Sequence, residues 1–186
     1  MDTDKLEKAV QSILKELGYK PDEHMKRTPA RVAEWLMDFE AVDLNGAGRI
    51  LEVVFPENVP GSLVIVGPVE YRSLCAHHLL PVNGKAWVGY LPDDGICGLS
   101  KLARLVEYFA TRLTVQERVT NQIADAIEEF LKPKGCMVVV SATHMCMSFR
   151  GVRDGDASTV TSAVRGVHET SDNARSEFLS LMKGYR

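Results

Sequence analysis

The chain of 186 residues is long enough to form a domain with a substantial hydrophobic core. Its apolar fraction of 45% and charged fraction of 25% are those of an ordinary globular protein, and its net charge of -3 gives no basis for nonspecific nucleic-acid binding. No apolar stretch reaches the roughly 20 residues of a membrane span, and the acidic start Met1-Asp2-Thr3-Asp4-Lys5 is unlike a signal peptide. We therefore expect a cytoplasmic protein without membrane or nucleic-acid partners, whose cysteines are reduced thiols or metal ligands.

The first half of the chain predicts helices followed by strands. Apolar residues recur at helical spacing over residues 4–17, and Gly18 can end that helix. A second helix can begin at Thr28-Pro29, because a capping side chain there precedes a proline in the first turn. Residues 43–48, with one Asn and two Gly, predict a loop. Strands are then expected at Leu51–Phe55, Leu63–Val66 and Gly84–Tyr90. Alternation in the last strand places three residues on one face: Ala86, Val88 and Tyr90.

A pair of amphipathic helices follows these strands. The first begins at Ser100 and has an inward stripe made of Leu102, Leu105, Val106 and Phe109. The second begins at Thr114 and has an inward stripe made of Val115, Val119, Ile123, Ile127 and Phe130.

The last part of the chain predicts more strands and a final helix. The run Cys136–Ala142 is typical of a buried strand in its length and valine content. Ser148–Phe149 and Ser158–Val164 predict further strands, and a helix is expected from about Ser171 to Met182. This order of elements favours an α+β protein with an antiparallel sheet, in which residues 1–48 form an N-terminal helical region and residues 49–186 a catalytic domain.

Two short clusters of potential metal ligands lie far apart in the sequence, Cys75-Ala76-His77-His78 and His144-Met145-Cys146. Residues three apart converge in a turn, so Cys75 and His78 can share a metal ion with Cys146 if the two segments meet. Catalytic zinc sites typically use three protein ligands and leave one position open for water. His77 and His144 would then serve as acid–base groups. The clusters predict a hydrolytic enzyme.

Other interpretations of these residues stay open. His77 would replace His78 as the ligand if residues 75–77 were extended, although His78-Leu79-Leu80-Pro81 favours a turn. His144 and Cys146 would face one cavity if the preceding strand continued through them. Taken singly, each cysteine or histidine is more simply an ordinary buried residue, and only the joint pattern favours a metal. Cys97 and Cys136 have no histidine neighbours and are expected to be structural or to line a pocket.

A third cluster combines a helix start with positive charge. Ser100 begins a helix whose free backbone N–H groups and dipole favour an anion, and Lys101 and Arg104 lie on one helical face. A solvated polar face explains the same pattern equally well. Arg150 and Arg153 add positive charge after the second metal-ligand cluster. In a chain of net charge -3, basic residues gathered around one cavity would suit a polyphosphate.

The segment Thr114-Val115-Gln116-Glu117 has two interpretations. It fits a capping box, in which Thr114 caps the helix and Glu117 reaches back to the cap. Alternatively, the Glu117 carboxylate can accept two parallel N–H bonds, which is what the Watson–Crick edge of guanine offers.

In this order, the motifs resemble those of GTP cyclohydrolase I of the zinc-dependent type. The resemblance covers most of residues 63–183, and it extends more weakly to Thr28-Pro29-Ala30-Arg31. It is carried by Ser73-Leu74-Cys75, His77-His78-Leu79-Leu80-Pro81, Gly98-Leu99-Ser100-Lys101-Leu102-Ala103-Arg104, Val115-Gln116-Glu117-Arg118, His144-Met145-Cys146, Arg150-Gly151 and Arg175-Ser176-Glu177-Phe178-Leu179.

The resemblance implies a tunnelling-fold (T-fold) domain whose subunits form pentameric barrels that pair into a homodecamer, with active sites between subunits. It also implies conversion of GTP and water to 7,8-dihydroneopterin triphosphate and formate, a product that can feed folate, biopterin or deazaguanine synthesis. Matching positions imply that Cys75, His78 and Cys146 hold Zn2+ and that His77 and His144 shuttle protons. They also imply that Gln116 and Glu117 hold guanine. The residues that would hold the triphosphate are Ser100, Lys101, Arg104, Arg150 and a neighbouring subunit's Arg31.

Ala76 departs from the family's pattern, which usually has a glutamate between the cysteine and the histidine pair. A methyl group neither accepts a hydrogen bond nor carries charge, and losing a group that supports metal ligands typically costs about 10–100-fold in affinity or activity. Two alternatives follow, a partial activity that stops at a formamide intermediate and a noncatalytic GTP-binding paralogue. A zinc nucleoside deaminase is disfavoured, because its His-x-Glu and Pro-Cys-x-x-Cys signature is missing.

Overall fold

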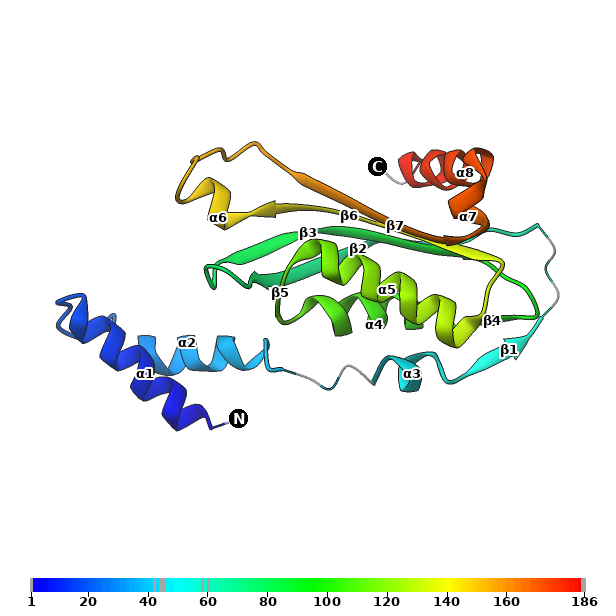
Figure 1. Cartoon of the computed structure of the whole chain (residues 1–186). Coiled ribbons are helices and arrows are strands. Elements are labelled where there is room, and N and C mark those ends of the chain that lie inside the picture. The colour runs from blue at the N-terminus through cyan, green and yellow to red at the C-terminus, as the bar shows by residue number, and fades with distance from the viewer. Residues whose placement is uncertain (1, 42, 44–45, 58, 60, 185–186) are drawn as a thin grey trace. The chain divides into compact units, whose positions relative to one another are not determined.

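The computed structural model describes residues 2–41, 43, 46–57, 59 and 61–184, which form two compact units, Met1–Val42 and Asp43–Arg186 (Figure 1). The predicted boundary after residue 48 falls within a short helix, Gly46–Leu51 (α3), and it stays a prediction. Among the described residues, no helix is both long and apolar enough to cross a bilayer.

The first unit contains two helices that pack on each other, α1 (Thr3–Glu16) and α2 (Thr28–Met37). The side chain of Asp2 caps α1 by accepting a hydrogen bond from the Lys5 N–H at 3.3 Å. After α1, Gly18 takes a φ of +80°, a conformation that glycine adopts at little cost. Helix α2 begins at Thr28 as predicted, but the predicted side-chain cap was wrong, because Arg27 occupies the cap position and makes no side-chain cap bond.

The second unit is built on a five-stranded sheet with the strand order β5-β2-β3-β6-β7. Its pairs are antiparallel except β2 and β5, which are parallel. The strands are β2 (Val64–Cys75), β3 (Pro81–Leu91), β5 (Leu113–Thr114), β6 (Gly135–His144) and β7 (Thr159–Gly166). A separate two-stranded sheet pairs β1 (Val54–Pro56) with β4 (Gly95–Cys97).

Helices cover both faces of the five-stranded sheet (Figure 1). Besides α3, the helices of this unit are α4 (Leu99–Ala110), α5 (Gln116–Leu131), α6 (Met145–Ser148), α7 (Val167–Thr170) and α8 (Asp172–Lys183). Helices α4 and α5 lie together on one face, and α8 lies on the other face at one end. This arrangement confirms an α+β protein with a largely antiparallel sheet.

Alternation along the strands explains the two-sided core. The predicted inward residues of β3 (Ala86, Val88 and Tyr90) are at most 1% exposed and pack with α4 and α5. Trp87, on the opposite side of the same strand, packs with Phe178 of α8. The predicted stripes of α4 and α5 are confirmed at Leu102, Leu105, Val106, Phe109, Val119, Ile123 and Ile127. Phe130 was predicted wrongly, because it is 38% exposed and its ring lies beside Gly48 of α3.

Three short elements differ from the sequence prediction. Part of the expected loop at 43–48 belongs to α3, and Leu51, only 1% exposed, ends that helix rather than beginning a strand. Thr114 belongs to β5 and not to a helix, because its carbonyl accepts the Ala76 N–H at 3.0 Å beside the parallel pairing with β2. The pair Ser148–Phe149 was also predicted wrongly, since Ser148 ends helix α6. Two to six residues carry too little periodicity to decide between these structures.

His168 in α7 gives the fold a pH dependence. It is 1% exposed, and neither ring nitrogen has a hydrogen-bond partner among the residues described. Burial lowers the pKa of His168 below its ordinary 6.5, against a smaller opposing effect of Glu177. The folded chain therefore disfavours the imidazolium, and the unfolded chain binds more protons just below pH 6.5. The uncharged His168 ring therefore contributes its full stabilisation above pH 6.5, and this stabilisation is lost as the pH falls toward the lowered pKa of His168.

We expect His168→Phe to reduce the loss of stability between about pH 7.5 and pH 5.5, a span chosen around the ordinary histidine value. Phenylalanine fills a similar volume and has no nitrogen to protonate. Urea unfolding at the two pH values measures the effect, and the exposed His24→Asn variant is the matched control. An unchanged pH dependence in His168→Phe would show that this imidazole is not responsible.

Candidate active site

A tight turn after β2 brings Cys75 and His78 together. The carbonyl of Cys75 accepts the N–H groups of His78 at 3.2 Å and Leu79 at 2.9 Å. Leu79 takes a left-handed φ of 56°, which lets the chain reverse into β3 within a few residues. The imidazole of His78 folds back over the thiol, with 3.5 Å between its Nδ1 and Cys75 Sγ. The predicted turn geometry is confirmed.

Strand β3 brings the distant Cys146 to the same place. It pairs with β2 on one side and β6 on the other, and Val82 lies opposite both Ser73 and His144. Helix α6 starts directly after β6 and carries Cys146 beside the turn. His144 and Cys146 line one pocket, as predicted, but they do not belong to one strand, because β6 ends at His144 and α6 carries Cys146.

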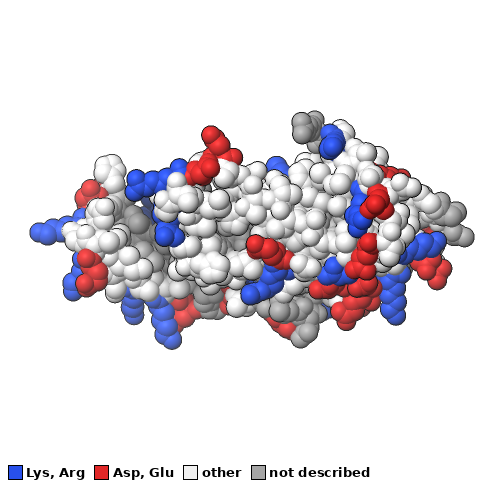
Figure 2. All heavy atoms as spheres, turned by 45° about the horizontal axis from the view of Figure 1, so that its top comes forward, with Lys and Arg blue, Asp and Glu red and all other residues white. Residues whose placement is uncertain are grey.

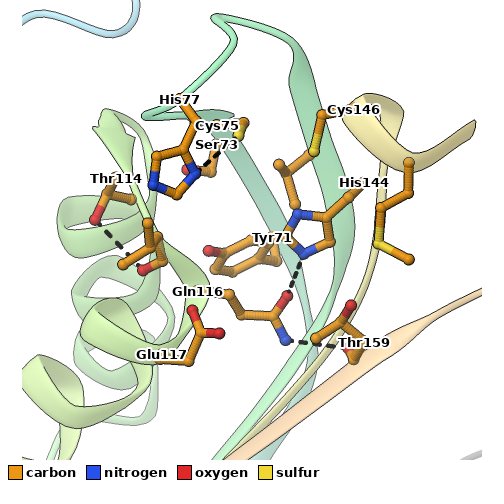
Figure 3. A pocket seen from close by; sticks show the side chains of 13 residues that line it. Tyr71, Ser73, Cys75, His77, Thr114, Gln116, Glu117, His144, Cys146 and Thr159 are labelled. Atoms are coloured by element: carbon orange, nitrogen blue, oxygen red, sulfur yellow. Dashed lines mark hydrogen bonds between the residues drawn. The ribbon is translucent and has the colours of Figure 1, made fainter. Parts of the chain in front are cut away.

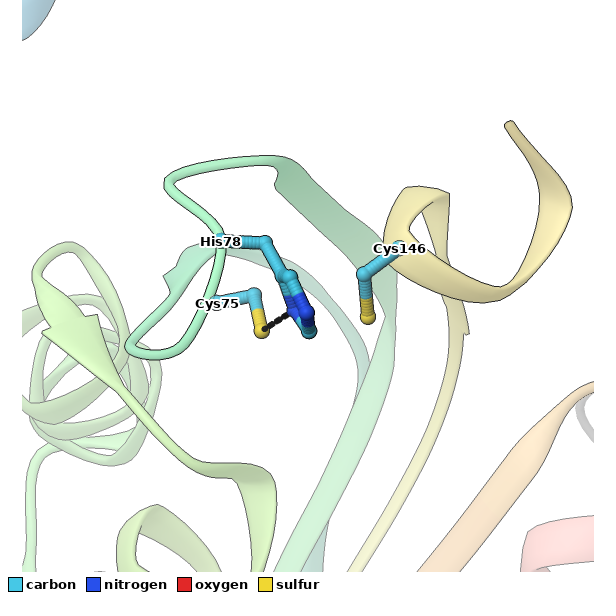
Figure 4. Close-up of side chains that lie close together, drawn as sticks. All are labelled: Cys75, His78 and Cys146. Carbon is cyan, nitrogen blue, oxygen red and sulfur yellow. Dashed lines mark hydrogen bonds between the residues drawn. The ribbon is translucent and has the colours of Figure 1, made fainter. Parts of the chain in front are cut away.

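The three predicted ligands form one cluster (Figure 4). One potential ligand atom from each of Cys75, His78 and Cys146 lies within 4.8 Å of the other two. Burial raises the pKa of the Cys146 thiol, and the neighbouring Cys75 raises it further. Two thiolates this close need a cation between them. Two sulfur ligands and one imidazole suit zinc, and three ligands leave an open coordination position.

His77 lies beside the cluster and is not part of it. Its Nδ1 is 3.9 Å from Cys75 Sγ, and its side chain lines the adjoining pocket. The alternative in which His77 replaces His78 required an extended chain at 75–77, whereas residues 76–78 form a turn. Arg150 contacts Nε2 of His78, so that ring has Cys75 on one side and a guanidinium on the other.

A pocket with a volume of about 220 Å³ opens next to the cluster (Figure 3). Side chains from strands β2 and β6 and from the start of α5 project into it, together with Cys146. His77 and His144 lie on different walls, and Glu117 lies at the start of α5. The pocket therefore places two imidazoles and a carboxylate beside a potential metal site.

Gln116 connects the pocket wall to the sheet. It is 2% exposed, and its Oε1 lies 2.8 Å from Nε2 of His144. Its Nε2 lies 3.1 Å from each of three acceptors, the carbonyls of Val140 and Thr159 and the hydroxyl of Thr161. Burial lowers the pKa of His144, against a smaller opposing effect of Glu117. The predicted contact of Gln116 with guanine stays a prediction.

Glu117 is exposed in the first turn of α5 and lines the pocket. The predicted capping box was wrong, because α5 has Val115 at its cap position and no side chain makes a cap bond. The hydroxyl of Thr114 instead lies 3.5 Å from the Val115 carbonyl. The Glu117 carboxylate is therefore positioned to meet a ligand rather than to hold the helix end.

The predicted anion-binding residues do not gather around this pocket within one chain. Ser100 and Arg104 line a separate hollow that also contains Arg72 and Glu107, whereas Arg150 lies at the metal cluster. The expectation that a single cavity collects them was wrong for the isolated chain. Arg31 lies in α2 of the first unit. On the face shown in Figure 2, basic and acidic side chains are interspersed, and no broad area carries one sign.

Among the lining residues that sequence reasoning did not assign to the site are Tyr71, Ser73 and Thr159. Tyr71 and Ser73 precede Cys75 by steps of two along β2 and share its face of the sheet. Period-two counting back from Cys75 could have found both, but no strand was predicted there. Burial raises the pKa of Tyr71 to about 12, so its hydroxyl stays protonated near neutral pH.

The fold and the site define an α+β protein in which a Cys-His-Cys group that could hold a metal ion adjoins a pocket lined by two histidines and a carboxylate, an arrangement typical of metal-dependent enzymes. Residues 6–183 match the sequence model of the family GTP cyclohydrolase I. The chain belongs to the GTP cyclohydrolase I family.

Three curated relatives, each called GTP cyclohydrolase 1, illustrate the similarity. The protein from Thermobifida fusca is 47% identical over 100% of this chain and 91% of its own length. The Aquifex aeolicus protein is 45% identical, with coverages of 99% and 98%. The Dictyostelium discoideum protein is 44% identical, with coverages of 96% and 77%. The crystal structure of the archaeosine synthase QueF-Like in the apo form is 16% identical, with a TM-score of 0.48, over 59% of this chain and 97% of that one.

Proposed function

We propose that this protein is a GTP cyclohydrolase I, which opens the guanine ring of GTP at C8 by hydrolysis, releases formate and forms 7,8-dihydroneopterin triphosphate. The observation that carries the proposal is the Cys75, His78 and Cys146 cluster, which adjoins a pocket lined by His144 and Glu117. Relatives named for this activity are 44% to 47% identical over nearly the whole chain.

In this proposal, Cys75, His78 and Cys146 hold Zn2+. When bound, the ion supplies a Lewis acid that polarises water and substrate beside the pocket. The pocket residues do the remaining work. Ring opening, formate release and reclosure each move protons, and imidazoles such as those of His77 and His144 are the most common general acids and bases in enzymes. Their places on different walls of the pocket allow them to serve different atoms of the substrate.

Substrate binding in this proposal divides between two parts of the surface. Glu117 holds the guanine, and the triphosphate is held by Ser100, Lys101, Arg104, Arg150 and a neighbouring subunit's Arg31. Ser100 and Arg104 line a different hollow from the metal cluster, so a site that uses both sets needs two copies of the chain. This separation supports active sites between neighbouring subunits, and the assembly that we propose is the family's pairing of T-fold barrels into a homodecamer.

The decisive experiment is incubation of purified, metal-quantified protein with GTP, with every product identified. We expect one bound zinc per chain and one formate released per GTP consumed. GTP left unchanged by a metal-free preparation that still binds it would favour a noncatalytic module. Formate below one per GTP would favour the partial activity that stops at a formamide.

Ala76 gives the partial activity its specific support, because the family usually has glutamate at this exposed position beside the cluster. The variant Ala76→Glu separates the two activities. If the natural chain completes the reaction, formate per GTP is the same in both proteins. A ratio that rises to one only in Ala76→Glu would establish that the natural chain stops early.

Glu117→Gln is expected to raise the KM for GTP by about 10- to 100-fold, because charged hydrogen bonds contribute roughly 1.5–3 kcal/mol. The free energy of unfolding should change by less than about 0.5 kcal/mol, as for most surface substitutions. Steady-state kinetics and urea unfolding measure the two effects, with Glu129→Gln in the last turns of α5 as the control. An unchanged KM with a stability loss of ~1 kcal/mol would restore the capping role.

A further inference from the structure

The orientation of the Gln116 side-chain amide follows from its neighbours. Carbonyl oxygens can only accept hydrogen bonds, and two of them, from Val140 and Thr159, lie 3.1 Å from one end of the amide. That end must therefore be the NH2 group. The opposite end is the amide oxygen, and it lies 2.8 Å from Nε2 of His144. A flipped amide would place its oxygen against both carbonyls.

Two threonines reinforce this orientation. The Thr120 hydroxyl donates its single hydrogen to the backbone carbonyl of Gln116, at 2.8 Å. In the 2.7 Å contact between Thr120 and Thr161, the Thr161 hydroxyl must then donate. Because the Thr161 hydroxyl donates its hydrogen to Thr120, its oxygen can only accept from the side-chain amide of Gln116, at 3.1 Å. All hydrogen bonds in this chain of residues are therefore consistent with one orientation of the Gln116 amide. The side chain of Thr120 is 0% exposed.

The direction of the chain decides where the His144 ring carries its proton. An amide oxygen only accepts, so the bond to it requires a hydrogen on Nε2 of His144. A neutral imidazole has one N–H, which leaves Nδ1 without a hydrogen. Figure 3 shows this second nitrogen turned away from Gln116, on the pocket side of the ring. In the part of the chain that the structure describes, Nδ1 makes no hydrogen bond.

We propose that Gln116 is a positioning residue, which holds His144 in the tautomer with hydrogen on Nε2 and presents a bare Nδ1 to the pocket. The catalytic meaning of this inference rests on the proposed function, whereas the tautomer itself does not. The role differs from the predicted contact with guanine, because both amide hydrogens are directed into the sheet. Gln116 then acts on the reaction through His144 and not on the substrate.

The tautomer is measured directly by NMR of the metal-loaded protein labelled with 15N-histidine, above the pH at which the ring is protonated. The His144 signals are identified by their loss in His144→Gln. We expect one tautomer, with the attached proton on Nε2 and an unprotonated Nδ1. A proton on Nδ1, or a mixture of both tautomers, would overturn the inference. This measurement needs no folded variant of Gln116.

Gln116→Met keeps a side chain of similar length and removes both the amide donor and the acceptor. We expect its His144 signals to show a mixture of tautomers. Zinc content should be unchanged, and kcat should fall about 10- to 100-fold, the usual cost of removing an outer supporting partner. The KM for GTP should change less than about twofold, because the substitution removes no contact with the bound substrate. The contrasting variant is Glu117→Gln, which is expected to raise the KM.

The outcomes separate this inference from the proposed function. A rise in KM with unchanged kcat in Gln116→Met would assign Gln116 to guanine binding and overturn the positioning role. A wild-type protein that leaves GTP intact but has the Nε2 proton would contradict the proposed function and support the tautomer. A protein that turns over GTP with its His144 proton on Nδ1 would support the proposed function and contradict the tautomer.

Discussion

Cys146→Ala is expected to abolish zinc binding and to lower GTP turnover by about 1000-fold or more. The cluster has three ligand residues from two distant segments, and removal of one thiolate leaves a Cys-His pair. A catalytic metal contributes several kcal/mol of charge stabilisation, and ~4 kcal/mol corresponds to a rate factor of about 1000. Metal analysis after dialysis and formate release from GTP measure the two effects.

Cys97→Ala is the matched control, because Cys97 is also a free thiol, is 4% exposed and lies outside the cluster. It should keep its zinc and its turnover. Circular dichroism should show a folded protein for both variants, since Cys146 is only partly buried at the edge of the hydrophobic core. If Cys146→Ala retained a full equivalent of zinc, the ligand assignment would be wrong.

His144→Ala is expected to keep its zinc and to lose about 100- to 10,000-fold in kcat, the usual range for removal of a general acid or base. The imidazole lies in the pocket wall, held by Gln116 at 2.8 Å, and it is not one of the three clustered ligands. Loss of turnover without loss of metal would therefore assign it to proton transfer. Pre-steady-state measurements can show which hydrolytic step slows.

The exposed His24→Ala, in the first unit, controls for the removal of an imidazole elsewhere. Undiminished turnover in His144→Ala would remove this residue from the mechanism and leave His77 as the acid–base group. Loss of zinc in His144→Ala would instead place it among the metal ligands.

The metal cluster was predictable because its signals are local and chemically rare. Cysteine and histidine three residues apart before Leu-Leu-Pro indicate a turn, and the structure forms that turn with two hydrogen bonds to the Cys75 carbonyl. The amphipathic stripes of α4 and of most of α5 were equally clear, because each spans several turns. Long periodic segments therefore gave correct helix faces, and the unusual residue types correctly indicated which side chains lie together.

Residues whose structure depends on distant partners were predicted poorly. Strand β2 runs through Cys75, although only Leu63–Val66 was predicted, because its later residues include exposed Glu70 and Arg72 and gain strand structure from pairing with β3. The hydrogen bonds of Gln116 to β6 and β7 were also invisible, since they join residues 24 and more positions apart. A single sequence gives no measure of such contacts.

The strand order has a consequence for how the proposed metal site would form. Cys75 ends β2 and Cys146 follows β6, and β3 lies between the two strands. In the folded chain, the pairing of these three strands holds Cys75 and Cys146, 71 positions apart in the sequence, in one cluster. In small zinc fingers the metal drives folding, whereas this sheet packs a hydrophobic core of its own, so we expect the chain to fold without the ion. Chelators should accordingly yield a folded apoprotein that recovers activity when zinc is returned.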